Sequence, residues 1–523
     1  MISKIQNGNT FLGIEFGSTR IKAVLTDDEC RCIASGSYDW ENKFENGYWT
    51  YSVDEIHKGL KGCYADLAKN VADKYGTDLC CIGAMGISGM MHGYLAFDEN
   101  DTLLVPFRTW RNTTTEEAAE KLTDLFGFNI PQRWSIAHLY QAILNNEPHI
   151  SKIAHITTLA GYIHFLLTGR RELGIGEASG MFPVENGVYH VDMVKKFGEL
   201  TKEQVWNIID ILPNVKTAGE KGAFLTEEGA RFIDPSGKLK AGIPVCPPEG
   251  DAGTGMVATN AVLPKTGNVS AGTSIFAMLV LENALKNLHK EIDIVTTPDG
   301  APVAMVHCNN CCGELDAWVK MFGEFAELAG ASLDKSALYE LLYKNTSIAD
   351  ADCGGITAFN YLSGEHVTGV EKGRPMYFRS AEGNMSLANF MQAQIYSSMA
   401  TLALGMEILL EKENVCIEQI QVHGGLFKVK GVAQQILADA LRTCVSVTET
   451  AGEGGAWGMA LLAAYMMKGN DISLGKWLSD CVFSEMNSTA VNPDEKGIYG
   501  FKEYLSRYKT ALDAEKKLEE VVC

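Results

Sequence analysis

A glutamate and a turn of small residues stand next to each other near the start of the chain. Glu15 belongs to an apolar run, and Gly17-Ser18-Thr19 follows almost at once. In such a turn, consecutive backbone N–H groups point into one concavity that can hold the oxygens of a phosphate. A neighbouring carboxylate can hold a hydrated Mg²⁺ ion that bridges those phosphates. Taken alone, however, the pattern is more typical of an ordinary hairpin with an exposed glutamate.

The same pattern returns about half a chain later, where Gly272-Thr273-Ser274 again lies between two apolar runs. Two such turns can hold one polyphosphate between their N–H and O–H groups. A repeat at this spacing also predicts a chain built from two similar halves. The halves share a pattern more than identical residues.

A third candidate is residues 247–255, a stretch rich in proline and glycine with Asp251 at its centre. Prolines stiffen the backbone, and glycines let a ligand come close to it. Phosphoryl transfer needs positioning, charge neutralisation and one base that accepts the proton of the attacking hydroxyl. A carboxylate on a rigid turn suits that base. Asp251 is also a candidate helix N-cap, and both roles are compatible because a helix N-terminus attracts anions.

Two more glycine-rich turns, Gly424-Gly425-Leu426 and the loop that contains Gly454, precede predicted helices. Turns of this kind suit a flat base and its ribose. They are not Walker A sequences, because no Gly-Lys-Ser/Thr motif is present. Each turn alone is a weak signal, since many turns are rich in glycine.

A sugar is the expected ligand of two further groups of residues. Met91 and His92 precede Gly93 in a predicted loop, and Trp110-Arg111-Asn112 lies nearby in the sequence. The imidazole can hydrogen-bond sugar hydroxyls, and the indole can stack on a sugar face. Against this, a lone histidine is more often structural, and methionine more often fills a core.

The elements that must position these residues alternate between strand and helix. Apolar runs flank both turns and predict strand hairpins at residues 10–25 and 267–280, and residues 82–97 predict strand, loop and strand. Helices are predicted at 116–126, 205–212, 387–410, 432–441, 456–467 and 501–518, and further strands at 417–422 and 445–447. The alternation predicts an α/β fold. A domain boundary is expected near residue 260, after a Gly- and Pro-rich stretch.

The charge balance excludes some classes of partner. The chain has 523 residues, of which 45 are basic and 65 acidic, giving a net charge of −20. Because an acidic protein repels phosphate backbones and anionic lipid, neither nucleic acid nor a membrane is expected as a partner. No secretory leader is recognisable, and the longest apolar stretch falls short of the roughly 20 residues of a membrane span. A cytoplasmic location is therefore expected.

The 14 cysteines are scattered and do not resemble a disulfide framework. One cluster, His307-Cys308-Asn309-Asn310-Cys311-Cys312, has a Cys-x-x-Cys spacing that can begin a zinc site. A convincing site would have a second pair at matching spacing, and none stands out nearby. A packed loop with free thiols is the favoured interpretation.

Together, these motifs resemble the FGGY family of carbohydrate kinases over nearly the whole chain. Five motifs stand in the family's order, namely the first phosphate motif at residues 13–19, the catalytic aspartate in Gly250-Asp251 with Gly253, the second phosphate motif at residues 269–274, the segment Tyr361-Leu362-Ser363-Gly364-Glu365-His366, and an adenine-binding signature from Gly424 through Gln434 and Asp439 to residues 453–460. Five motifs in order make the resemblance specific.

The resemblance implies an actin-like ATPase fold, with two ribonuclease H-like domains around a cleft. Residues 1–260 would form the sugar-binding domain and residues 261–523 the ATP-binding domain. ATP would be the phosphate donor, Mg²⁺ would neutralise its phosphates, and closure of the cleft would exclude water. A homodimer is left open, because family members are often dimers.

Roles follow from the resemblance for single residues. Asp251 would be the catalytic base, and Glu15 would hold Mg²⁺, directly or through water. Residues expected to contact the sugar are Met91, His92, Trp110, Arg111, Asn112 and Asp251. Residues expected to bind ATP are Gly17, Ser18, Thr19, Gly272, Thr273, Ser274, Gly424, Gly425, Leu426 and Gly454.

The segment Met91-His92-Gly93 is similar to the sugar-contacting Met-His-Gly of xylulokinases, which implies a ketopentose phosphorylated on its 5-hydroxyl. D-xylulose is the leading candidate, and L-ribulose, the ketopentose of arabinose catabolism, is the alternative. An actin-like ATPase without a sugar acceptor is the alternative from another class. Asp251 argues against it, because an ATP switch needs no base aimed at an alcohol.

The chain departs from the family's pattern at three positions. Glu15 replaces an aspartate, and its extra methylene moves the carboxylate by roughly 1.5 Å. Asn112 stands where an aspartate is common, so the position keeps an acceptor but loses the charge. His366 replaces the arginine that usually follows Tyr-Leu-Ser-Gly-Glu. These changes leave the identity of the sugar open, but not the type of reaction.

Overall fold

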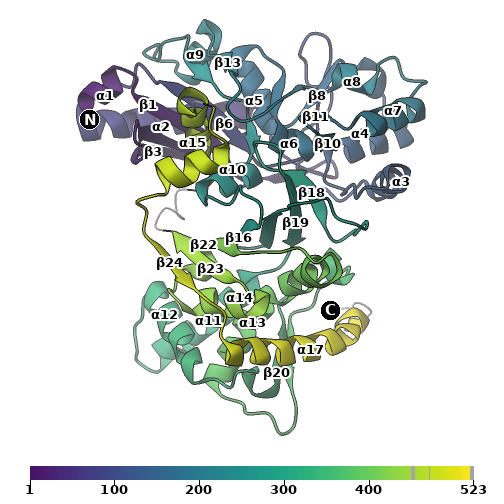
Figure 1. The fold of residues 1–523 in the computed structure, drawn as a ribbon, viewed down its shortest axis with the longest axis vertical. Helices are drawn as coiled ribbons and strands as arrows, with labels where there is room; N and C mark the ends of the chain where they lie inside the picture. Colours follow the sequence, from purple (N-terminus) through teal and green to yellow (C-terminus); the bar gives the residue numbers. More distant parts are fainter. Residues whose placement is uncertain (449–453, 470, 519–523) are drawn as a thin grey trace. The chain divides into compact units, whose positions relative to one another are not determined.

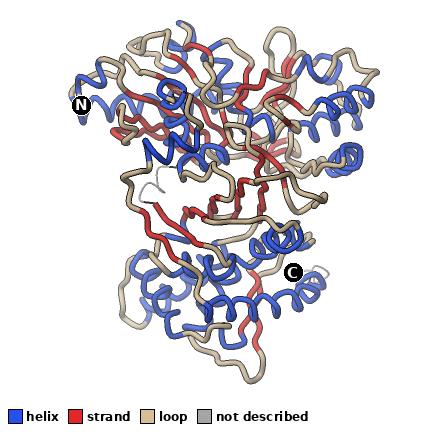
Figure 2. The backbone as a smooth tube through the Cα atoms, in the orientation of Figure 1, coloured by secondary structure: helices blue, strands red, loops and turns tan. Residues whose placement is uncertain are grey.

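The computed structural model spans the chain, and its described residues are 1–448, 454–469 and 471–518. Strands and helices alternate along it, which confirms the predicted α/β class (Figure 2). The chain forms two compact units (Figure 1). Unit 1 comprises Met1–Leu263, Asp293–Val303 and Glu453–Glu485, and unit 2 comprises Pro264–Ile292, Ala304–Gly452 and Met486–Cys523.

This arrangement differs from the predicted division into residues 1–260 and 261–523. The change of unit at Leu263 lies close to the expected boundary, but Asp293–Val303 and Glu453–Glu485 return to unit 1. The second of these segments carries helix α15 (Gly454–Lys468), which packs on the unit 1 sheet. A boundary read along the chain cannot show such a return, because packing rather than sequence distance decides it.

The main sheet of unit 1 has the strand order β13-β14-β6-β1-β2-β3, with β15 beside β6. Its strands are β1 (Thr10–Phe16), β2 (Arg20–Asp27), β3 (Cys32–Asp39), β6 (Ala84–Gly89), β13 (Ala223–Phe224), β14 (Pro244–Val245) and β15 (Glu249–Gly250). The unit's other strands are β4 (Lys43–Glu45), β5 (Tyr48–Thr50), β7 (Leu95–Phe97), β8 (His155–Thr157), β9 (Glu172–Gly174), β10 (Val184–Glu185), β11 (Val188–Tyr189), β12 (Asn214–Lys216) and β18 (Asp293–Thr296). Its helices, besides α15, are α1 (Ile2–Gln6), α2 (Val53–Tyr75), α3 (Glu116–Phe126), α4 (Ser135–Leu144), α5 (Leu159–Thr168), α6 (Ile175–Ser179), α7 (Val191–Leu200), α8 (Ile208–Ile211), α9 (Glu227–Ile233), α10 (Asp251–Ala258) and α16 (Leu474–Trp477).

Strand alternation gives this sheet two covered faces. Leu12, Ile14 and Phe16 share one face of β1 and belong to a core cluster that includes the buried side of α2. Gly13 and Glu15 point to the other face, where α15 packs. The sheet therefore lies between two layers of helix (Figure 1). Its central parallel strands β1 and β6 are accordingly buried along nearly their whole length.

Unit 2 repeats this plan around a sheet with the order β19-β17-β16-β22-β23-β24. Its strands are β16 (Thr266–Ala271), β17 (Ile275–Val280), β19 (Pro302–Cys308), β22 (Gln419–Gly424), β23 (Cys444–Thr448) and β24 (Ser488–Val491), with a separate pair β20 (Ile356–Phe359) and β21 (Met376–Arg379). Its helices are α11 (Cys312–Leu328), α12 (Lys335–Asn345), α13 (Leu387–Glu407), α14 (Val432–Leu441) and α17 (Glu495–Leu518). In both units a parallel strand pairs with the first strand of an antiparallel hairpin. β6 pairs with β1 of the β1-β2 hairpin, and β22 pairs with β16 of the β16-β17 hairpin.

Helix α13 is the core helix of unit 2. With the π-helical turn that follows, Leu387–Lys412 is long and apolar enough to cross a membrane, but 83% of its most apolar stretch is buried inside the protein. It packs against β20, α12, α14 and α17. Its apolar composition is accounted for by this central position.

Most predicted elements are confirmed, and two helices, α3 and α14, have the predicted bounds. The helix predicted at residues 205–212 is wrong, because only α8 forms there. Asn207 is extended before α8, and Leu212 is extended after it, with ψ of 146°. Pro213 explains the second end, because a residue before proline is disfavoured in the helical region.

Gly13 provides a test of the packing of α15 on β1. A Cβ at this position would lie deep inside contact distance of the Ala456 carbonyl and 2.5 Å from the Ala460 nitrogen. We expect Gly13→Ala to lower the free energy of unfolding by about 1–3 kcal/mol, because the helix backbone must move away. Gly198→Ala in α7 is the matched control, since a Cβ there meets nothing within 4 Å. The control should stabilise by up to about 1 kcal/mol through helix propensity. Equal urea midpoints for both variants would contradict the close packing.

Candidate active site

Three of the predicted motifs follow the carboxyl ends of neighbouring parallel strands. β1 and β15 both run parallel to β6, and the register places Phe16, Gly89 and Gly250 in one row. The residues that come next are the first turn (residues 17–19), the Met91-His92 segment and Asp251. Segments far apart in the sequence therefore meet at one edge of the sheet. This is the edge where α/β sheets bind their ligands.

The first turn has its carbonyl groups tied back into the protein. The Gly17 carbonyl accepts a hydrogen bond from Trp40 Nε1 at 2.7 Å, and the Ser18 carbonyl accepts one from the Tyr51 hydroxyl at 2.6 Å. The Thr19 carbonyl accepts the backbone N–H of Trp40 at 3.2 Å. Carbonyl oxygens repel an anion, whereas N–H and O–H groups attract it. With its carbonyls held this way, the turn is suited to receive a phosphate.

Glu15 lies at the N-terminus of α15. Its Oε2 accepts the backbone N–H of Ala456 at 3.2 Å, and Gly455 leaves the space that the carboxyl needs, since a Cβ there would lie 2.5 Å from Oε1. Burial, together with the nearby Asp251 carboxylate, raises the pKa of Glu15 to about 7. A bound cation would favour the charged form and reverse this shift. The carboxyl is thus chemically suited to a metal ion that arrives with a phosphate.

Asp251 is the first residue of α10. One oxygen, Oδ1, accepts the backbone N–H groups of Met91 at 3.2 Å and of Ala252 at 2.9 Å. Burial raises the pKa of Asp251 to about 6, and these two N–H groups limit the rise. A base titrating just below neutral pH is charged at pH 7 and still has appreciable proton affinity. The other oxygen, Oδ2, can accept the proton of a hydroxyl group.

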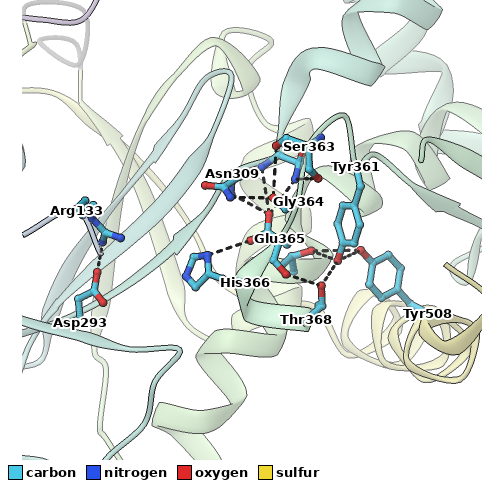
Figure 3. Close-up of polar contacts among 12 residues, drawn as sticks. Arg133, Asp293, Asn309, Tyr361, Ser363, Gly364, Glu365, His366, Thr368 and Tyr508 are labelled. Carbon is cyan, nitrogen blue, oxygen red and sulfur yellow. Dashed lines mark hydrogen bonds and ion pairs between the residues drawn. The ribbon is translucent and has the colours of Figure 1, made fainter. Parts of the chain in front are cut away.

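His92 is held in one protonation state and one tautomer. It adopts the left-handed conformation with φ of 70°, and its ring stacks on Trp134 at 6.1 Å between centroids. Nδ1 lies 2.9 Å from the Gly180 carbonyl, which can only accept, so Nδ1 carries the hydrogen and Nε2 carries a lone pair. Burial, and then the charge of Arg133, lowers the pKa of His92 to about 3. Arg133 itself pairs with Asp293 (Figure 3).

Two buried acids beside Asp251 escaped the sequence analysis. Glu249 accepts the backbone N–H groups of Gly176 at 3.3 Å and of Glu177 at 2.9 Å, and burial raises its pKa to about 8. Glu177, on α6, is fully buried against Gly250, where a Cβ would lie 2.5 Å from Oε2. Burial raises the pKa of Glu177 far above its usual range, and the Thr158 hydroxyl offsets this only in part. The sequence signal that could have found these acids is an adjacent glycine, because Glu177 follows Gly176 and Glu249 precedes Gly250.

Trp110 and Arg111 lie beside aromatic and hydroxyl groups of unit 1. Trp110 Nε1 donates to Ser18 Oγ at 3.3 Å, so the indole supports the first turn. The Arg111 guanidinium stacks over Trp49, 4.0 Å from the ring centroid.

Asn112 is buried, and its amide is engaged by backbone groups. Oδ1 accepts the Trp49 N–H at 2.8 Å, and Nδ2 donates to the carbonyls of Trp49 and Thr109, both at 2.9 Å. The side chain therefore fastens β5 to the loop after Arg108. The Asn112 amide N–H groups thus already donate to backbone carbonyls, and the expected contact of Asn112 with the sugar stays a prediction.

The ATP motifs of unit 2 meet at the end of parallel strands in the same way. The register of β16 and β22 pairs Ala271 with Gly424, so the second turn (residues 272–274) and Gly425-Leu426 leave adjacent strand ends. Gly424 has φ of 108°, and a Cβ there would clash with the Ala271 carbonyl. Only glycine fits this close approach. Gly454, by contrast, belongs to unit 1, where it opens α15 near Glu15; residues 451–453 lie outside the described part of the chain.

The Cys-x-x-Cys motif braces the second turn. Cys311 N–H donates to the Thr273 carbonyl at 2.9 Å, and Cys312 N–H donates to the Gly272 carbonyl at 3.1 Å. Cys308 and Cys311 are buried free thiols. Within the described ranges, no group of three or more His, Cys, Asp or Glu side chains is arranged to hold a metal ion.

Comparison with known proteins agrees with this geometry. Residues 10–258 match the N-terminal domain of the FGGY family of carbohydrate kinases, and residues 267–467 match its C-terminal domain. The chain belongs to this family. It is an ATP-dependent sugar kinase with the actin-like ATPase fold, as the resemblance of its motifs implied.

This FGGY kinase is similar to proteins of more than one activity. It is 22% identical over 471 residues to the xylulose kinase of Haemophilus influenzae, covering 85% of this chain and 89% of the relative. A ligand-bound xylulose kinase from Lactobacillus acidophilus has a TM-score of 0.78 at 15% identity, covering 98% of each chain. A gluconate kinase from the same organism also has a TM-score of 0.78 at 15% identity, covering 97% of this chain and 99% of its own. The likeness to the two structures shows the fold and leaves the sugar open.

The buried acids predict an unusual dependence of stability on pH. Glu249 has a folded pKa of about 8, whereas an exposed glutamate titrates near about 4.3. The folded protein keeps a proton that the unfolded chain releases, so the stability linked to Glu249 is complete at low pH and is lost as pH rises toward 8. Its share of the free energy of unfolding should fall by about 1.4 kcal/mol per pH unit between about pH 5 and 8.

Urea unfolding at pH 5.5, 6.5 and 7.5 tests this for Glu249→Gln, which cannot titrate. We expect the variant to show a shallower decline than the unaltered protein by this amount. The exposed Glu199 provides the matched control, and Glu199→Gln should leave the slope unchanged. Parallel curves for all three proteins would show that Glu249 is charged in the fold at neutral pH.

Proposed function

We propose that this kinase transfers the γ-phosphate of ATP to the 5-hydroxyl of a ketopentose, with D-xylulose as the first candidate. The main support is the pair formed by Asp251 and the Met91-His92 segment, which the Met91 N–H to Asp251 hydrogen bond joins at 3.2 Å. It couples a base that is charged at neutral pH to a neutral imidazole with a free acceptor nitrogen. The named activity of the Haemophilus influenzae relative supports xylulose as the sugar.

In this proposal Asp251 accepts the proton of the attacking hydroxyl. The sugar oxygen forms a bond to the γ-phosphorus, the bond from that phosphorus to the β,γ-bridging oxygen breaks, and ADP leaves. A second sugar hydroxyl donates a hydrogen bond to His92 Nε2, whose lone pair is fixed by the Nδ1 contact with Gly180. Met91 lines the site beside them. Asp251 keeps its place because both of its N–H donors come from the backbone.

In each unit taken by itself, the groups proposed to bind ATP are backbone N–H and hydroxyl groups of a turn, namely the first turn in unit 1 and the second turn with the glycine turn of β22 in unit 2. The residues are Gly17, Ser18, Thr19, Gly272, Thr273, Ser274, Gly424, Gly425 and Leu426, with Gly454 beside Glu15. Mg²⁺, when bound, would neutralise phosphate charge during transfer. Glu15 would hold it, directly or through a water molecule, since the Ala456 N–H engages only one of its oxygens.

Trp110, Arg111 and Asn112 have a different proposed role. Trp110 holds the Ser18 hydroxyl, and Asn112 fixes the strand that carries Trp49. We infer that Trp110 supports the first turn and that Arg111 and Asn112 shape the segment around Trp49, while contacts of the three residues with the sugar stay a prediction.

A panel of acceptors tests the proposed function. ADP release with ATP-Mg²⁺ should be fastest with D-xylulose and slower with L-ribulose, D-ribulose, gluconate, glycerol and no sugar. The product should be a 5-phosphate by NMR. A preference for L-ribulose would change the sugar and keep the site. Phosphorylation of gluconate alone would overturn the ketopentose assignment, and ADP release that ignores every acceptor would overturn sugar transfer from this site.

The base predicts both a variant and a pH profile. Asp251→Asn should lower turnover by roughly 10²–10⁴, the usual contribution of a general base, while ATP still binds. Because Asp251 acts when deprotonated and has a pKa of about 6, kcat/KM should fall about tenfold per pH unit below pH 6. Asp192→Asn, at an exposed position of α7, is the control. Near-normal turnover of Asp251→Asn would remove Asp251 from the mechanism.

A further inference from the structure

Two motifs in unit 2 are left without a role by the proposed transfer, namely residues 307–312 and the segment 361–366. The first supports the second turn directly. The backbone N–H groups of Cys311 and Cys312 donate to the carbonyls of Thr273 and Gly272, at 2.9 and 3.1 Å. These two bonds turn the carbonyls toward α11. The position of the second turn therefore depends on the position of the Cys311 and Cys312 amides.

Asn310 connects this bracing loop to the segment 361–366. Its Oδ1 accepts the backbone N–H groups of Leu362 at 2.9 Å and of Ser363 at 3.0 Å, and its Nδ2 donates to the Ser363 carbonyl at 3.3 Å. In addition, Asn360 Nδ2 donates to the Cys311 carbonyl at 2.9 Å. Asn310, which precedes Cys311, and the carbonyl of Cys311 itself are thus both tied to residues 360–363.

Glu365 is the acceptor at the centre of this network (Figure 3). Its Oε2 accepts three N–H groups, from the Asn309 backbone at 2.8 Å, from the Asn310 backbone at 3.3 Å and from Asn310 Nδ2 at 3.1 Å. Its side chain is fully buried, and Oε1 lies 3.7 Å from His366 Nδ1. Without this acceptor, the backbone N–H groups of Asn309 and Asn310 would lose their partner, and Asn310 Nδ2 would keep only the Ser363 carbonyl. A buried N–H group without a partner is costly.

The segment itself is fixed to the core of unit 2. The Tyr361 hydroxyl lies 2.8 Å from Thr401 Oγ1 on α13 and 2.8 Å from the Tyr508 hydroxyl on α17, and Thr368 Oγ1 is 3.1 Å away (Figure 3). The Glu365 backbone also pairs with Val370. The backbone that carries Glu365 is therefore held in place by α13 and α17. A carboxyl held in this way can set the position of the loop 309–312.

We propose that Glu365 is a positioning residue for nucleotide binding, which acts through Asn310 and the Cys311 and Cys312 amides on the second turn. This inference rests on the proposed role of residues 272–274 in holding ATP phosphates. Glu365 hydrogen-bonds to Asn309 and Asn310 and acts on the second turn through them. It holds the loop whose N–H groups keep the turn's carbonyls away from an incoming phosphate. Its loss should affect the nucleotide and leave the sugar site of unit 1 intact.

The test compares two substitutions of Glu365 in the full-length enzyme. Glu365→Ala removes the acceptor and should raise the KM for ATP by at least about tenfold, as expected when buried donors lose their partner. The KM for the sugar should change less than about twofold. Glu365→Gln keeps an oxygen for the Asn309 and Asn310 donors and should restore the KM for ATP to within about threefold of the original value. Asn310→Ala combined with Glu365→Ala should add little, because the two residues act as one unit.

A purely structural role would give a different result. It would lower the melting temperature and the active fraction, seen as kcat, without separating the two KM values. Glu382→Gln, at an exposed position of unit 2, controls for the change of charge and should leave both KM values unchanged. An unchanged KM for ATP in Glu365→Ala would overturn the inference.

Direct binding separates this inference from the proposed function. The affinity for a non-hydrolysable ATP analogue is measured by calorimetry for the unaltered enzyme and for Glu365→Ala. If the enzyme binds the analogue but phosphorylates no sugar, the proposed function fails, and the loss of affinity in the variant still decides the role of Glu365. If the unaltered enzyme does not bind the analogue, both proposals fail.

Discussion

The burial of several carboxyl groups at one edge of a sheet is the constraint on which the unit 1 site depends. Glu15, Glu249 and Asp251 all have raised pKa values, because burial penalises the charged form of each. The Asp251 carboxylate further opposes the ionisation of Glu15. Asp251 accepts two backbone N–H groups on one oxygen and has the lowest of the three pKa values. At neutral pH, Asp251, the proposed base, is therefore the most fully charged of the three carboxyl groups.

The first and second turns, both proposed to bind phosphate, have their carbonyl oxygens engaged by different donors. A turn that binds an anion must keep its carbonyl oxygens away from it. In unit 1, Trp40 and Tyr51 hold the carbonyls of the first turn. In unit 2, two amides at the start of α11 do the same for the second turn. The duplicated strand hairpins therefore share their backbone plan, while the donors behind each turn were assembled separately.

The fold alone does not decide the sugar. A xylulose kinase and a gluconate kinase superpose on this chain equally well. Discrimination between acceptors must therefore come from side chains that meet the substrate. His92 is the proposed example, because its neutral ring accepts but does not donate at Nε2. Asn112 looked like such a residue in the sequence, yet its buried amide is satisfied by the backbone. A polar residue near a motif is a specificity residue only if one of its groups remains available.

The α/β class, the paired hairpins, most helices and the family could be predicted from the sequence, because these depend on local periodicity and on motifs that are short and contiguous. Asp251, His92 and both turns are candidate site residues on the same grounds. The packing of distant segments was needed to show that α15 returns to unit 1, that Glu177 and Glu249 are buried near Asp251, and that the Cys311 and Cys312 amides brace the second turn. The physical reason is strand register. Aligning Phe16, Gly89 and Gly250 in one row brings together residues more than a hundred positions apart, and no local pattern records which side chains will then share one buried space.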